Sequence, residues 1–140
     1  MTSLNLGRAS ARGAAAFCAG FAAFQIALAL GAPFGQMTWG GATAVLPPNL
    51  RAASAGACAY LLLAAAAMLV RAGDWGRGLP QAPFRWFNGF LALQLLLNTA
   101  ANLASPSPLE RYGMGAASAL GAGLCLCALV VVRPAARDPR

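Results

Sequence analysis

The sequence predicts an all-α, polytopic membrane protein in which residues 1–140 form a single four-helix transmembrane bundle. Hydrophobic residues make up 59% of the chain and charged residues 9%, whereas about a quarter of the residues of a soluble domain are charged. The charges are also segregated. No Asp, Glu, Lys or Arg lies between Arg12 and Arg51, Arg51 and Arg71, Arg85 and Glu110, or Arg111 and Arg133.

Each of these uncharged gaps can hold one membrane crossing. A helix rises about 1.5 Å per residue and the hydrocarbon core is about 30 Å thick, so roughly 20 apolar residues span it once. Backbone groups in lipid must pair within their own segment, and the runs are too long and too unalternating for barrel strands. We therefore expect helices at about 14–32, 50–70, 84–103 and 108–132, joined by an outer loop at 33–49 and an inner loop at 71–83.

The first of these segments also has features of a secretory signal, because Arg8 and Arg12 precede an apolar run that ends in small residues. The run is long for a signal peptide, and three further segments follow it. We expect a retained helix that also directs insertion.

The arginines predict the orientation, because the basic side of short loops stays in the cytoplasm. On one side of the predicted spans lie Arg8, Arg12, Arg71, Arg77, Arg85, Arg133, Arg137 and Arg140, and on the other only Arg51 and Arg111. Both termini are therefore expected to be cytoplasmic. Topology accounts for the net charge of +7, and no nucleic-acid partner is expected. The absence of lysine beside abundant Ala and Arg suggests a GC-rich bacterial genome, and hence the bacterial inner membrane.

The two longer loops differ in composition. The outer loop is apolar, and we expect it to lie on the bilayer interface or to fold back over the bundle, with Trp39 suited to the headgroup region. The inner loop is a glycine-rich polar linker, in which we expect Asp74 to balance the charges of Arg71, Arg77 and Arg85 in solvent.

The third segment carries a set of polar residues. Gln94, Asn98 and Asn102 recur every four residues and share one stripe of a helix, with Asn88 and Thr99 close to it. Gln25 of the first segment lies at comparable depth. The favoured interpretation is hydrogen bonding between helices, at about 0.6 to 2 kcal/mol for each bond.

The alternative interpretation of this stripe is a small cavity open to the outer face, with Gln25, Glu110 and Arg111 at its border. Neutral amides can hold a polar or zwitterionic ligand but cannot relay protons. Acidic residues are missing from the middle of every predicted span, which argues against a proton-coupled exchanger.

Glu110, the only glutamate, follows Ser107 at the spacing of a helix capping box, in which the serine oxygen accepts a backbone N–H of the first turn and the carboxylate accepts the backbone N–H of the serine. Pro108 then occupies the first helical position, where its missing N–H costs nothing. The pattern favours a structural role over a catalytic or ligand-binding one, and the two roles can coexist.

Two further sets of small residues are interpreted as packing elements. Gly113, Ala117 and Gly121 form a seam for close helix contact with a neighbouring helix or with a second copy of the chain. The cysteines all fall inside predicted spans without a C-x-x-C pair, so we interpret them as small apolar residues: Cys18, Cys58, Cys125 and Cys127. With no histidine and no clustered acids, neither a metal site, nor another cofactor, nor Ser-His or Cys-His catalysis is expected.

Two stretches also carry a resemblance. QIALALGAPFGQMTWGG, followed by LPPNLR, and later NTAANLASPSPLER are similar to a group of small, uncharacterised bacterial integral membrane proteins with four predicted spans. Its motifs are G-A-P-W/F-G after the first span and N-x-x-S/T-P-S-x-x-E-R before the last. The resemblance covers most of the chain and implies no activity. By the match, the motif residues are Gly31, Pro33, Gly35, Gly40, Gly41, Pro47, Asn102, Pro106, Ser107, Glu110 and Arg111. Phe34 replaces an expected Trp and Met114 an aromatic residue, which puts ring stacking there in doubt.

These observations predict an integral membrane protein and favour an accessory or interaction role over an enzymatic one. Its expected partners are the lipid bilayer and either a second copy or another membrane protein. One alternative is an oligomeric transporter or channel subunit that uses the polar face of the third segment. Another is a membrane enzyme that uses Glu110 and Arg111 on a lipid-like substrate.

Overall fold

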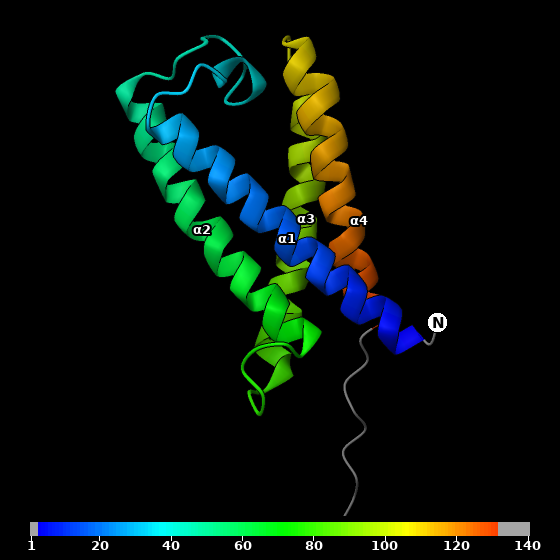
Figure 1. Ribbon diagram of the computed structural model, residues 1–140. Coiled ribbons are helices and arrows are strands. Elements are labelled where there is room, and N and C mark those ends of the chain that lie inside the picture. Colours follow the sequence, from blue (N-terminus) through cyan, green and yellow to red (C-terminus); the bar gives the residue numbers. More distant parts are fainter. Residues whose placement is uncertain (1–2, 132–140) are drawn as a thin grey trace, which may run out of the picture.

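The computed structural model describes residues 3–131, and within them the chain forms helices and no strand (Figure 1). The prediction of an all-α fold is confirmed. The elements are α1 (Ser3–Ala29), a 3-10 turn η1 (Gly35–Met37), α2 (Pro48–Ala72), α3 (Gln81–Leu103), a π-helix η2 (Leu109–Met114) and α4 (Gly115–Val131).

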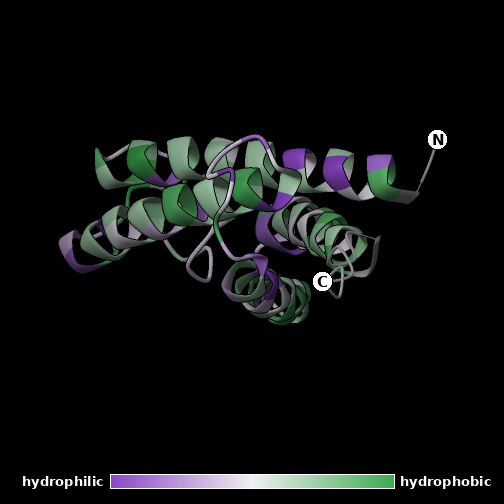
Figure 2. Cartoon of the chain, turned by 90° about the horizontal axis from the view of Figure 1, so that it is seen from below, coloured by the Kyte–Doolittle hydropathy of each residue, from purple (hydrophilic) through white to green (hydrophobic). Residues whose placement is uncertain are grey.

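The four long helices form two hairpins. α1 lies beside α2 and α3 beside α4 both in Figure 1 and in Figure 2, where the molecule is turned. The hairpins cross near the N-terminus and diverge toward the connection at residues 30–47. We call the end with residues 30–47 and 104–108 the long-loop end, and the end with the N-terminal part of α1 and residues 73–80 the arginine end.

Three helical segments are long and apolar enough to cross a membrane, namely Leu4–Ala29, Pro48–Ala72 and Leu109–Leu129. Apolar side chains also cover much of the outer surface, with Leu63 70% and Trp86 81% exposed. Soluble monomers rarely expose contiguous apolar patches on this scale. In Figure 2 hydrophobic and near-neutral colours run along most of the helices. The structure is therefore compatible with a membrane protein.

α3 has 23 residues, a length within the range of the other helices, but it is not among the three segments that qualify as spans within residues 3–131. Its amides and Arg85 lower its hydropathy below that of its neighbours. The polar stripe is thus the feature that distinguishes α3 from a plain membrane helix.

The helix that was expected near residue 14 begins at Ser3. No proline interrupts residues 3–13, so the helix continues through Arg8 and Arg12 beyond its apolar part. α2 begins with Pro48 at its first position, where proline is favoured. The expected last span is one continuous helical segment made of η2 and α4, while residues 132–140, with Arg133, Arg137 and Arg140, lie outside the described residues.

The core lies toward the arginine end and is built mainly from small side chains. Its fully buried members include Ala11, Cys18, Ala64, Met68, Ala122 and Ala128. Small residues let helix backbones approach closely, as in membrane helix pairs. Gly121 shows this closeness, because a Cβ there would lie 2.6 Å from Cε1 of Phe17.

At the arginine end, Asp74 is exposed to solvent as expected, and its hydrogen-bonded partner is Arg12, which the expectation did not include. The Arg12 guanidinium donates two hydrogen bonds to its carboxylate, at 2.7 and 2.6 Å, and so links α1 to the connection between α2 and α3. These bonds lower the pKa of Asp74 below its usual value. Arg12 and Asp74 are 62 residues apart, so sequence spacing alone does not predict that they pair.

At the long-loop end, Arg51 donates from Nε to the carbonyl of Ala29 at 2.8 Å and satisfies the end of α1. Residues 30–47 fold back over the bundle, one of the two expected arrangements, with Leu46 buried and Gly35 N–H bonded to Ala44 O at 2.8 Å. This loop therefore covers the space between the diverging hairpins.

Candidate ligand-binding cavity at the long-loop end

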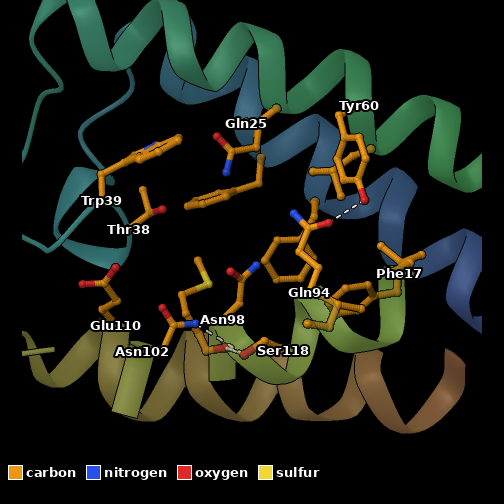
Figure 3. A pocket seen from close by; sticks show the side chains of 17 residues that line it. Phe17, Gln25, Thr38, Trp39, Tyr60, Gln94, Asn98, Asn102, Glu110 and Ser118 are labelled. Atoms are coloured by element: carbon orange, nitrogen blue, oxygen red, sulfur yellow. Dashed lines mark hydrogen bonds between the residues drawn. The ribbon is translucent and has the colours of Figure 1, made fainter. Parts of the chain in front are cut away.

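A cavity of about 460 Å³ lies between the two hairpins at the long-loop end (Figure 3). Its volume is within the range of about 300 to 1,000 Å³ found for small-molecule sites. Its lining combines an aromatic group with a polar group. The aromatic residues are Phe17, Phe21, Phe24, Trp39 and Tyr60, and the polar residues are Gln25, Thr38, Gln94, Asn98, Asn102, Glu110 and Ser118.

The three stripe amides of α3 all line this cavity. The Tyr60 hydroxyl donates to Oε1 of Gln94, and Asn102 donates from Nδ2 to the Ser118 hydroxyl oxygen at 3.3 Å. The exposed side chain of Asn98 makes no hydrogen bond to a described residue. The stripe therefore supplies both bonded and unbonded amides to one space.

Gln25 faces the stripe from α1 (Figure 3). Its Oε1 atom is buried and has no hydrogen-bond partner among the described residues. An unpaired buried acceptor costs about 1–3 kcal/mol, so most such atoms in native proteins are paired. This atom is the strongest single indication that the cavity is made to hold a hydrogen-bond donor.

Asn88 and Thr99 do not line the cavity, and both act in helix packing. Asn88 is fully buried and donates from Nδ2 to the Cys125 carbonyl at 3.2 Å, which joins α3 to α4. The Thr99 hydroxyl donates to the carbonyl of Leu95 at 2.8 Å and lies 3.0 Å from the Ser118 hydroxyl. Of the candidate polar residues, Asn88 and Thr99 therefore hold helices together, whereas the others line the cavity.

Glu110 is buried at the mouth of the cavity and bonds to residues 30–47. Its Oε1 accepts the backbone N–H of Gly40 at 3.1 Å, and its Oε2 accepts the hydroxyl of Ser105. The Ser107 hydroxyl donates to Gln36 O at 2.7 Å. The bonds of Gly40 N–H to Glu110 and of the Ser107 hydroxyl to Gln36 O thus join residues 30–47 to the start of η2.

The expected capping box forms only in part. Glu110 N–H lies 3.5 Å from the Ser107 hydroxyl oxygen, as the spacing predicts. The carboxylate does not return to Ser107 N–H, which bonds to the Ser105 hydroxyl at 3.2 Å instead. The reason is that the loop offers Glu110 a second donor, Gly40 N–H, 70 residues away in the sequence.

η2 sets the direction of these side chains. A π-helix has wider turns than an α-helix, is rare, and occurs frequently at functional sites. Glu110 lies on its cavity side, whereas Arg111 donates from Nε to the Ser105 carbonyl at 3.0 Å and is not a lining residue. The structure therefore separates these two candidate residues.

Trp39 lies in an unusual backbone conformation. Its φ is +55°, in the left-handed region that bulky residues rarely occupy, and Gly40 and Gly41 follow at +85° and +67°. The indole N–H donates to the Ser54 hydroxyl at 3.0 Å, and the ring lines the cavity. Trp39 therefore has a bonded position over the bundle as well as an exposed edge.

Phe17, Phe21 and Phe24 form the wall contributed by α1, with ring centroids 4.6 and 6.2 Å apart along the series. Behind them lies a second, apolar hollow of about 440 Å³, which they share with Met37, Gly113 and Ala117. Sequence reasoning missed this wall, although the spacing of four and three residues on one helix face indicates it.

The packing seam, which begins in η2 with Gly113 and continues in α4 with Ala117 and Gly121, meets different neighbours along its length. Gly121 packs against Phe17, whereas a Cβ on Gly113 would meet nothing within 4 Å. All four cysteines are free thiols, with Cys125 buried and Cys127 exposed, as expected for residues two apart on a helix. The seam thus holds the aromatic wall in place at one end.

A scan against protein-family models and searches of curated proteins and of solved structures find no match to this chain. The resemblance to small four-span bacterial proteins therefore stays a sequence-based prediction.

Proposed function

We propose that the protein is a four-span integral membrane protein of the bacterial inner membrane that binds a small polar organic molecule in the long-loop-end cavity. The single observation that carries this proposal is the buried, unpaired Oε1 of Gln25 in a cavity that also holds the unbonded amide of Asn98. Convergent polar groups in a partly apolar hollow are the usual form of a small-molecule site.

The proposed orientation places the arginine end in the cytoplasm. Support comes from the roles of the arginines at the other end, because Arg51 and Arg111 each donate to a backbone carbonyl. The two arginines that lie on the side with fewer basic residues thus each stabilise the backbone at that end. α3 is the fourth proposed span, with its polar face turned to the cavity and the bundle instead of lipid.

Binding without chemistry is favoured over catalysis. Glu110 is the only acidic side chain of the lining, and both its oxygens already accept hydrogen bonds. Arg111, the other residue of the enzymatic hypothesis, bonds to backbone outside the lining. An accessory role toward another membrane protein is compatible with ligand binding, and the ligand would then regulate that role.

Transport is the second candidate. The observation in its favour is the shared phenylalanine wall, which separates the polar cavity from the apolar hollow. Passage toward the arginine end would require the small-residue core to open. Oligomeric state in native mass spectrometry and uptake by vesicles containing the protein distinguish transport from binding.

The test of binding uses the purified full chain in detergent and a panel of small amines, carboxylates, amino acids and polyols. A molecule that binds only the folded protein raises its Tm. We expect at least one class to do so and Asn98→Leu to reduce the shift. Asn49→Leu is the matched control, because Asn49 is exposed on α2 and does not line the cavity. A panel without any effect, or a shift that Asn98→Leu leaves unchanged, contradicts the proposal.

A further inference from the structure

We propose that the ligand of this cavity is an organic cation, an ammonium group carried on an apolar or aromatic body. This inference rests on the proposed function and names the chemical class that the cavity selects. The ammonium group would lie near Glu110 and Gln25, and the body against the phenylalanine wall.

The charge of the lining is the first argument. Glu110 contributes a carboxylate, and no arginine or lysine is among the lining residues. The two arginines at this end of the bundle, Arg51 and Arg111, are bonded to the carbonyls of Ala29 and Ser105. A cationic ligand therefore meets an opposite charge there, whereas an anion meets a like charge.

Acceptor oxygens without a partner are the second argument. The amide oxygens of Gln25 and Asn102 have no hydrogen bond within the described residues, while Asn102 Nδ2 donates to Ser118. Tyr60, the phenol of the lining, already donates to Gln94. An ammonium group has three donors and no acceptor, so it can pair with these two acceptor oxygens, of which that of Gln25 is buried.

The aromatic residues are the third argument. Five aromatic rings from α1, α2 and the long loop line the same space, and Figure 3 shows Trp39 and Glu110 toward one side of it and Phe17 toward the other. Ring faces attract ammonium groups, at about 0.5–1 kcal/mol in exposed sites and more when water is excluded. The lining thus offers a polar part for a charged head and an apolar part for its body.

The test uses Trp39 as the reporter in the full chain with Trp75→Phe and Trp86→Phe, since both of these residues are exposed and neither lines the cavity. Fluorescence in detergent is titrated with three probes of similar shape: 2-phenylethylammonium, 2-phenylethanol and 3-phenylpropionate. We expect the cation to bind at least about tenfold more tightly than the alcohol, and the anion to bind most weakly.

Two variants identify the residues responsible. Glu110→Gln keeps an acceptor for Gly40 N–H and should reduce the cation preference to about threefold or less. Asp74→Asn removes the same charge at the arginine end and should leave the preference unchanged. Gln25→Met, which does not touch the long-loop hydrogen bonds, should weaken cation binding several-fold while raising Tm, because it removes an unpaired buried amide.

The outcomes separate the two proposals. If the alcohol or the anion binds as tightly as the cation, the choice of ligand class is overturned and the binding function stands. If Glu110→Gln and Asp74→Asn change the preference equally, the carboxylate at the mouth is not its cause and the inference fails. If none of the three probes changes the fluorescence or the Tm while a member of the wider panel raises the Tm, the choice of ligand class is overturned and the binding function stands. If the wider panel also has no effect, both proposals are overturned.

Discussion

The same four helices pack closely at one end of the bundle and leave a cavity at the other. Toward the arginine end, the helices meet through alanines and buried cysteines, and the hairpins are in close contact. Toward the long-loop end, aromatic and amide side chains separate the hairpins, and a loop covers the gap. The difference teaches that a change in side-chain size from one end of the bundle to the other divides this small fold into a packed half and a hollow half.

The largest expected effect comes from adding volume to the packed half. Ala64 is fully buried, so Ala64→Leu should destabilise the protein by about 1–3 kcal/mol. Ala57 lies about two turns earlier on α2 and lines the cavity, so Ala57→Leu should change stability by about 0.5 kcal/mol or less. Thermal unfolding of both variants in detergent checks this. Equal losses of stability in the two variants would show that the two halves do not differ in packing.

The next effect concerns the cover of the hollow half. Gly40 and Gly41 both have positive φ, where a Cβ costs roughly 1–2 kcal/mol, but only at Gly41 would it clash, 2.4 Å from Ser107 Cβ. The loop can detach while the helices stay packed, so Gly41→Ala should alter Trp39 fluorescence more than Tm. Gly40→Ala is the control and should keep the wild-type spectrum. A normal spectrum for Gly41→Ala would show that the loop is not held as described.

A smaller effect is expected at the border between the halves. Tyr60→Phe removes the hydrogen bond to Gln94 and should cost about 0.6 kcal/mol, the average for bonds between membrane helices. Tyr112→Phe is the matched control, because that side chain is 70% exposed, and it should be neutral. Chemical denaturation of both variants measures the difference. A neutral Tyr60→Phe would mean that the cavity does not depend on this bond.

The smallest effect is expected for the exposed ion pair at the arginine end, since such pairs contribute little. Arg12 lowers the folded-state pKa of Asp74, so the pair's contribution is complete above the unfolded-state pKa of about 3.9 and is lost as the pH falls through the lower folded value. Wild type should therefore be slightly more stable than Asp74→Asn at pH 7. The difference should vanish in strong acid and shrink with salt. A difference that persists in acid would assign it to another cause.

The sequence was sufficient for the packed half but not for the hollow one. Hydropathy and the uncharged gaps predicted each helix, because apolar length is a local property of the chain. The early start of α1 was missed, since a helix can continue past its apolar part where no proline ends it. The spacing of Gln94, Asn98 and Asn102 placed them on one face, which the structure turns toward the cavity.

The contacts that form the mouth of the cavity depend on distant parts of the chain. Gly40 N–H bonds to Glu110, which is 70 residues away, and the Trp39 indole N–H bonds to Ser54 of α2. Capping patterns describe a few neighbouring residues, so they could assign Ser107 and Glu110 to a helix start but could not include the loop. Helix geometry groups Asn88 and Thr99 with the stripe. It gives the side of the helix from which a side chain projects, but not the neighbouring residue that the side chain meets.

The π-helix at residues 109–114 makes the position of the carboxylate a matter of residue count. Its wide turn accommodates one residue more than an α-helical turn. Removing a single residue between Glu110 and Gly115 would let this segment close into an ordinary α-helix, because about five α-helical residues turn through the same angle as the six residues of the wider helix. Glu110 would then keep its direction relative to α4. The same deletion inside α4 would instead turn everything before it by roughly 100° relative to the rest of that helix. Single-residue deletions at these two places are therefore the changes that would separate membrane insertion from ligand recognition.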